Sequence, residues 1–151
     1  MILGIDPGRS SGGVCFLEKD GTVTALEVMP PLLYSLVEMI HEYNPRMVFL
    51  EKAQSFPGQG ISSAFNYGDH FGQLQGVLIA LQKPYTLVGP ARWTKELHIG
   101  CTGEDAKAKS LQAVTRIFPT VDLIATERSR KPHEGLIDAL LIAEYGRRSC
   151  A

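Results

Sequence analysis

Acidic residues stand at the ends of otherwise apolar segments in this chain, and that pattern limits the possible folds more than any other feature of the sequence. The first segment, Met-Ile-Leu-Gly-Ile, runs directly into Asp6, and a later one, Met-Val-Phe-Leu, runs into Glu51. Glu134 and Asp138 open a third segment, which continues Ala-Leu-Leu-Ile-Ala. Short apolar runs of this kind are typical of buried strands, and longer ones of buried helices. We therefore expect an α/β fold that gathers these acids into one cluster.

Length and composition indicate one globular domain that spans residues 1–151. With 44% apolar and 21% charged residues, the chain has the composition of an ordered protein. It has no apolar run near the roughly 20 residues that span a bilayer, and its first residues lack the features of a signal peptide, so we expect no membrane contact. The cysteines, Cys15, Cys101 and Cys150, are widely spaced and predict free thiols in a cytoplasmic protein.

Charge is distributed unevenly along the chain. The net charge of −1 by itself gives no reason to expect a polyanionic partner. Residues 1–51 carry seven acids and three bases, whereas residues 52–151 carry nine acids and twelve bases. The basic excess therefore follows the first two acidic segment ends.

The remaining patterns predict a mixed five-stranded sheet flanked by helices. Strands are expected at residues 1–6, 12–18, 22–28, 47–51 and 85–88, the first three as an antiparallel meander and the fourth parallel to its neighbour. Helices are expected at residues 32–44, 64–81, 90–97, 104–118 and 132–147, with acids in the first turn of the fourth. Residues 52–62 and 120–131 have the composition of loops.

Three glycines recur at intervals of four residues in the helix expected at 64–81. Gly68, Gly72 and Gly76 fall on one helical face, at a cost in helix propensity. We expect this face to pack closely against the sheet or against a partner subunit.

The acids suit a hard divalent cation such as Mg²⁺, which prefers oxygen ligands. Two such ions, about 3.5–4 Å apart, can activate water and stabilise the leaving oxygen in phosphoryl displacement. Glu134 and Asp138, spaced i and i+4, would repel each other on a helix unless a cation relieved the repulsion. Structural alternatives remain: Asp6-Pro7-Gly8 is also a common turn, Glu134 also suits a helix N-terminus, and His133 is either a cap or an auxiliary ligand.

In order and spacing, several motifs together resemble the RuvC-type Holliday-junction resolvases. They are Ile-Leu-Gly-Ile-Asp-Pro-Gly followed by Ser-Ser-Gly-Gly-Val, the strand-terminal Glu51, the Lys109-Ser110 pair, and His-Glu-Gly-Leu-Ile-Asp-Ala-Leu-Leu-Ile-Ala from His133. The stretches from Phe56 to Gly68 and from Val88 to Trp93 look especially like the RuvC-like proteins of bacteriophages.

This resemblance implies an RNase H-like fold and a homodimer with two active sites. It also implies a crossover junction endodeoxyribonuclease that makes paired symmetric nicks in four-way DNA junctions, in DNA recombination, DNA repair or phage DNA processing. The expected cofactor is Mg²⁺ or Mn²⁺, two ions per active site, with no nucleotide cofactor. The expected location is the cytoplasm of a bacterium or of a phage-infected cell.

By position in the family pattern, Asp6, Glu51 and Asp138 would be metal-binding acids. Many members place an Asp where this chain has Gly135, so we assign the fourth place to Glu134, with His133 as its rival. Lys109 resembles a catalytic basic residue near the scissile phosphate. The residues expected to bind DNA are Arg92, Lys95, Lys107, Phe56 and Gln54.

Competing interpretations stay open. A YqgF-like RNA-processing nuclease would share the fold and the first motif, and a junction-binding scaffold would have lost the metal chemistry. The Asp-x-Gly pattern at Asp6 also resembles the actin and sugar-kinase superfamily, but those proteins need a second domain. For Lys95 and Lys107 the alternative is a solvated helix surface, for Phe56 a buried loop anchor in place of base stacking, and Trp93 is expected in the core.

Overall fold

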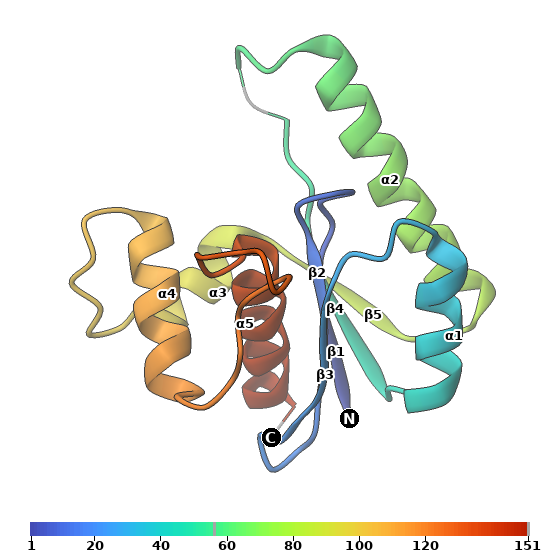
Figure 1. Ribbon diagram of the computed structural model, residues 1–151. Coiled ribbons are helices and arrows are strands. Elements are labelled where there is room, and N and C mark those ends of the chain that lie inside the picture. The colour runs from blue at the N-terminus through green and yellow to red at the C-terminus, as the bar shows by residue number, and fades with distance from the viewer. Residues whose placement is uncertain (56, 151) are drawn as a thin grey trace.

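The computed structural model describes residues 1–55 and 57–150, which form a five-stranded mixed sheet with helices on both faces (Figure 1). The strands are β1 (Ile2–Asp6), β2 (Gly13–Leu17), β3 (Val23–Val28), β4 (Met47–Glu51) and β5 (Tyr85–Val88). The helices are α1 (Leu33–Tyr43), α2 (Ile61–Ala80), α3 (Pro90–Leu97), α4 (Ala106–Ile117) and α5 (Glu134–Ser149). The expected α/β architecture is confirmed.

The strand order β3-β2-β1-β4-β5 places the first acid-bearing strand in the centre of the sheet. β1 pairs with β2, and β2 with β3, in antiparallel fashion, whereas β1, β4 and β5 run parallel. Ile5 lies opposite Leu50, one residue before each strand's acid. Because parallel strands end at the same edge of a sheet, Asp6 and Glu51 emerge side by side.

Two apolar layers hold the helices to the sheet. One face carries α3, α4 and α5 and the other carries α1 and α2 (Figure 1). Residues of β1 alternate between the two layers, with Ile2 in the first and Leu3 and Ile5 in the second. Their complete burial explains why this strand reads as a continuous apolar run.

Helix α5 lies unusually close to the sheet because glycines face it. A side chain at Gly4 would overlap the backbone of Ala139 and Ala143, and one at Gly135 would overlap the turn at Ser11 and Gly12. The first turn of α5 therefore rests on the β1–β2 connection. This close approach places the N-terminal end of α5 at the sheet edge where Asp6 ends β1.

Helix α2 extends beyond the end of the sheet (Figure 1). It buries His70, Leu74 and Leu78, but its glycines point away from these residues. A Cβ atom at Gly68, Gly72 or Gly76 would meet nothing within 4 Å. The alternative that this glycine face packs against the sheet is therefore wrong, and the other alternative, a partner subunit, stays a prediction.

Two element boundaries differ from the sequence prediction in informative ways. α2 begins at Ile61, earlier than residue 64, and α4 begins at Ala106, later than residue 104. Asp105 is the N-cap of α4, where its carboxylate accepts a hydrogen bond from the Ala108 N–H at 2.8 Å. The acids expected in the first turn of α4 thus precede it, since an aspartate side chain satisfies a free helix N–H best from the cap position.

The expectations about thiols and membranes can also be compared with the structure. Cys15, Cys101 and Cys150 are free, as expected. Within residues 1–55 and 57–150, no helix is long and apolar enough to cross a membrane.

Candidate functional site

Asp6 and Glu51 form the strand-borne half of the candidate site. The Gly8 N–H donates a hydrogen bond to the Asp6 carboxylate at 3.3 Å, so the Asp-Pro-Gly turn also serves to orient this acid. The Trp93 indole N–H donates to the Glu51 carboxylate at 2.7 Å. Both acids are partly buried at the edge of the sheet.

Asp138 and Glu134 form the helical half. They occupy the first two turns of α5, so the close seating of this helix brings them to the same edge. Burial, together with the negative charges of Asp6, Glu51 and Glu134, raises the pKa of Asp138 to about 8, and the Ser110 hydroxyl opposes this rise. All four predicted acids therefore lie within electrostatic reach of one another.

Burial and neighbouring negative charges also raise the pKa values of the two strand-borne acids. Burial raises the pKa of Asp6 to about 6, opposed by the Gly8 N–H and assisted by the charge of Glu134. Burial raises the pKa of Glu51 to about 7, opposed by the Trp93 hydrogen bond and assisted by the charge of Asp6. Without a cation, the protein disfavours ionising these carboxylates together.

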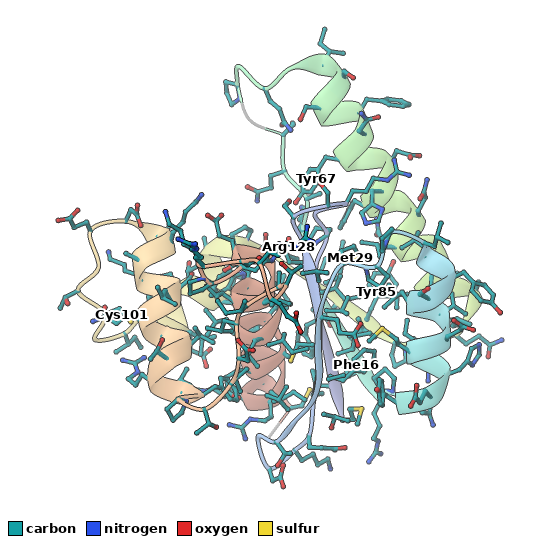
Figure 2. The ribbon with its side chains drawn as sticks, in the orientation of Figure 1. Phe16, Met29, Tyr67, Tyr85, Cys101 and Arg128 are labelled. Atoms are coloured by element: carbon teal, nitrogen blue, oxygen red, sulfur yellow. The ribbon has the colours of Figure 1, made fainter. Side chains whose placement is uncertain are left out.

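Tyr67 of α2 also lies near these carboxylates. Burial raises the pKa of its phenol, and the charges of Asp6 and Glu51 raise it further. Figure 2 shows Tyr67 at the end of the sheet where β1 and β4 terminate. The phenol therefore remains protonated and able to donate a hydrogen bond at this edge.

A pocket of about 190 Å³ opens between β4, α3, α4 and α5. Its lining residues are Glu51, Pro90, Trp93, Thr94, Ala106, Lys107, Ser110, Glu134, Ile137 and Asp138. Lys107 is the basic residue among these lining residues, and its ammonium group donates a hydrogen bond to the Glu134 carboxylate at 2.8 Å. Since Lys107 and Glu134 are 72% and 61% exposed, this ion pair can open to admit a ligand at little energetic cost.

The donor set fits a hard divalent cation, although the acids are not closed into a cage. Within residues 1–55 and 57–150, no group of three His, Cys, Asp or Glu side chains is close enough to enclose an ion. Mg²⁺ does not require such a cage, because one or two carboxylates with water and substrate phosphate usually hold it. The partly buried, mutually repelling carboxylates of Asp6, Glu51 and Asp138 would supply such oxygen ligands.

The structure explains why Gly135 carries no acid. Its backbone contacts the β1–β2 turn so closely that any side chain would overlap Ser11 and Gly12. Glu134 is the neighbouring acid, and its charge reaches both Asp6 and Asp138. His133 is the N-cap of α5, but its side chain makes no capping bond and its buried Nδ1 has no partner. Glu134 and His133 thus both remain candidates for the fourth metal ligand.

The basic and DNA-binding candidates are spread around this edge. Lys107 lines the pocket. Lys109 is close to His98, and burial together with the charge of Lys109 lowers the pKa of His98. Arg92 and Lys95 are exposed and line a separate hollow on α3, and Gln54 lines another beside Tyr67. The prediction for Phe56 lies outside the described residues.

Three contributors to the site were not predicted from the sequence. Trp93 is buried, as expected, but it also donates a hydrogen bond to Glu51, and the Ser110 hydroxyl lowers the pKa of Asp138. His98 in turn bonds Ser110 at 3.1 Å. No pattern in the sequence indicated these contacts. In the structure α3 starts directly after β5, whose Val88 pairs with Glu51, and this pairing brings the first turn of α3 near that acid.

Comparisons with known proteins identify the fold. No family model and no curated protein sequence matches the chain. Thermus thermophilus RuvC in complex with Holliday junction substrate is similar at a TM-score of 0.70 and 18% identity, over 99% of this chain and 94% of RuvC. A second Thermus thermophilus RuvC structure gives 0.61 and 23%, over 98% and 96% of the two chains.

The yeast mitochondrial Holliday junction resolvase is similar at a TM-score of 0.62 and 18% identity, over 97% of this chain and 77% of the yeast protein. Similarity at these identities establishes a shared fold. RuvC has an RNase H-like fold, and the five-stranded mixed sheet with five flanking helices matches it, so the expected fold is confirmed.

Proposed function

We propose that this protein is a metal-dependent endonuclease that resolves four-way DNA junctions. The observation that carries the proposal is the convergence of Asp6, Glu51, Glu134 and Asp138, from three different elements, at one sheet edge. There, burial and the charges of neighbouring acids raise the pKa values of Asp6, Glu51 and Asp138. The shared fold supports it, because the solved structures with this fold include a RuvC bound to a Holliday junction and a yeast junction resolvase.

Asp6, Glu51 and Asp138 would hold Mg²⁺ or Mn²⁺, with Glu134 or His133 completing the set. Two ions per site are proposed, and when bound they supply an activated water and stabilise the departing oxygen of the cleaved phosphodiester. The raised pKa values mean that ion binding would displace protons from the acids, so the affinity for metal should rise with pH.

Basic residues around the edge would bind the DNA backbone. Arg92 and Lys95 on α3 are exposed, as is Arg128, which lies near the N-terminal end of α5 (Figure 2). Lys107 and Lys109 on α4 would act as point charges on phosphate, Lys107 after release from Glu134. Such contacts position a substrate without reading its sequence.

A homodimer would supply the second active site that paired symmetric nicks require. Helix α2 offers an apolar stripe at helical spacing, with Ile61, Phe65 and Ile79 exposed by 90%, 72% and 64%. The exposed glycines Gly68, Gly72 and Gly76 continue the same stripe. A self-complementary stripe of this kind suits a two-fold interface, in which the same surface of each subunit meets its copy. The free thiols fit a cytoplasmic location, in a bacterium or in a phage-infected cell.

Cleavage of a synthetic four-way junction tests the proposal. The purified protein should nick two opposed strands with Mg²⁺ or Mn²⁺ and bind without cutting in Ca²⁺, and linear duplex should remain intact. Mapping the cut positions on each labelled strand checks the symmetry. Tight binding with no nicking in any metal would contradict the proposal and favour a scaffold. Cleavage of structured RNA instead of junction DNA would favour an RNA-processing nuclease.

A further inference from the structure

Trp93 binds the carboxylate of Glu51 directly. The indole is 3% exposed, is packed in the apolar layer of α3, α4 and α5, and donates its N–H to Glu51 Oε2 at 2.7 Å. A buried charge-assisted hydrogen bond of this length restricts where the carboxylate can lie. It also opposes the effect of burial on the pKa of Glu51, so it favours the ionised form that a cation binds.

His98, at the other end of α3, reaches Asp138 through one intermediate. Its Nε2 lies 3.1 Å from the Ser110 hydroxyl, and that hydroxyl lowers the pKa of the Asp138 carboxylate. A hydroxyl has a single proton to donate. If that proton goes to Asp138, Nε2 must carry the proton of the neutral imidazole and donate it to Ser110. In that tautomer the His98 ring keeps the proton of the Ser110 hydroxyl directed toward Asp138.

Trp93 lies within the short helix α3, and His98 is the C-cap that ends it. The Trp93 and His98 rings pack edge to face, with centroids 5.8 Å apart and planes at 87°. Arg116 of α4 fixes the end of α3 by donating to the carbonyls of Leu97 at 3.0 Å and Ile99 at 2.8 Å. α3 thus bridges the strand-borne acid Glu51 and the helix-borne acid Asp138, which no backbone pairing connects.

We propose that α3 sets the separation of Glu51 and Asp138, with Trp93 and His98 as positioning residues for the metal site. This inference rests on the metal-binding part of the proposed function and deepens it. Partners that orient metal ligands typically contribute about 10–100-fold to metal affinity. Their loss should therefore weaken the binding of metal itself, before any DNA is present.

The first test measures Mn²⁺ binding to the protein alone, by calorimetric titration. Trp93→Phe keeps an aromatic ring and removes the N–H, and should weaken Mn²⁺ binding about 10-fold. Tyr85→Phe is the matched control, because it also removes one side-chain hydrogen bond, to Gln75 at 3.3 Å, on an element that bears no acid. It should leave Mn²⁺ binding within about twofold of wild type.

The second test uses variants of His98, so that the positioning role can be tested even if the Trp93 variant fails to fold. His98→Leu cannot donate to Ser110 and should weaken Mn²⁺ binding about fivefold to 10-fold, whereas His98→Gln can donate and should restore most of it. In these variants Trp93, the only tryptophan, reports on the site through its fluorescence. Mn²⁺ should change its emission at the concentrations at which calorimetry detects binding.

The outcomes separate this inference from the proposed function. Weaker Mn²⁺ binding in Trp93→Phe and His98→Leu, with recovery in His98→Gln, supports the positioning role whether or not junctions are cut. Unchanged Mn²⁺ binding in folded Trp93→Phe and His98→Leu overturns it, even if the wild type cuts junctions with metal. Equal loss in His98→Leu and His98→Gln also overturns it, because packing alone would then account for the effect.

Discussion

The two ends of α5 hold an acidic residue in opposite electrostatic environments. At the C-terminal end, Glu144 is 1% exposed and receives hydrogen bonds from Arg147 at 2.7 and 2.9 Å and from Arg148 at 2.7 Å. Burial alone would raise the pKa of Glu144, but the arginines outweigh it and the pKa lies below its ordinary value. At the N-terminal end, burial and three other acids raise the pKa of Asp138 to about 8.

The difference separates an acid whose charge is neutralised within the fold from an acid that the proposed metal site would use. Two arginines of the same helix satisfy Glu144 locally, at i+3 and i+4. Within residues 1–55 and 57–150, Asp138 has no ion pair with a base; the Ser110 hydroxyl lowers its pKa, but its neighbours Asp6 and Glu51 carry the same charge and raise it. Proteins retain such frustration where a bound partner relieves it, and perturbed pKa values accordingly concentrate at functional sites. The comparison therefore predicts opposite consequences for substitutions at the two ends.

The largest expected effect is on catalysis. Asp138→Asn, like Asp6→Asn or Glu51→Gln, should lower junction cleavage by about 1000-fold or more, because a carboxylate needed for metal chemistry is lost. Junction affinity, measured at fixed salt by electrophoretic shift, should change less than about threefold. Glu144→Gln is the control at the other end of α5, and its cleavage rate per folded molecule should equal that of wild type. A parallel loss of binding in all three acid variants would contradict the assignment.

A smaller effect is expected on stability at the C-terminal end. Arg147→Met combined with Arg148→Met keeps the apolar stems but leaves Glu144 buried without its cations, which should lower the free energy of unfolding by about 3 kcal/mol at pH 7. Because the pKa of Glu144 is depressed in the native state, the stability from this pair is present above its unfolded value and is lost as pH falls. Urea unfolding at pH 7 and pH 4 checks both points. An equal difference between variant and wild type at both pH values would refute the electrostatic explanation.

The pH dependence of stability is expected to have the opposite sign at the N-terminal end of α5. Between the unfolded pKa of Asp138, 3.8, and its native value of about 8, the native state holds a proton that the unfolded state has released, so this acid lowers stability as pH rises. Without metal, Asp138→Asn should therefore be more stable than wild type by about 2 kcal/mol at pH 8, and by almost nothing near pH 4. Thermal unfolding in chelator measures the difference. Added Mg²⁺ should stabilise wild type more than the variant.

The smallest effect is expected for the exposed pair of Lys107 and Glu134. Lys107→Ala should change the free energy of unfolding by less than about 0.5 kcal/mol, since the pair is open to solvent. Junction affinity should fall severalfold, and the dependence of binding on salt should become shallower by about one phosphate contact. Leu111→Ala, at an exposed position on the same helix, serves as the control for loss of side-chain area. A salt dependence identical to wild type would exclude contact between Lys107 and phosphate.

Much of the fold was predictable because its signals are local. Burial makes each strand of the sheet centre apolar, and turn residues separate the strands, so β1, β4 and their terminal acids could be predicted from neighbouring residues alone. The boundaries of α2 and α4 were less accurately predicted. The start of α4 depends on the capping contact that Asp105 makes. The face to which the glycines of α2 point was also undecided, because a helical repeat defines a stripe but not what covers it.

The sequence by itself determined that the chain forms an α/β layer fold and that Asp6, Glu51 and Asp138 end or open core elements, since periodicity and burial act over a few residues. Only the tertiary structure decided that Trp93 donates a hydrogen bond to Glu51 and that His98 forms a hydrogen bond with Ser110, close to Asp138. It also decided that Gly135 has no room for an acidic side chain. Those facts depend on contacts between residues that are distant along the chain. Packing of α3, α4 and α5 on the sheet creates the contacts, and no local pattern encodes them.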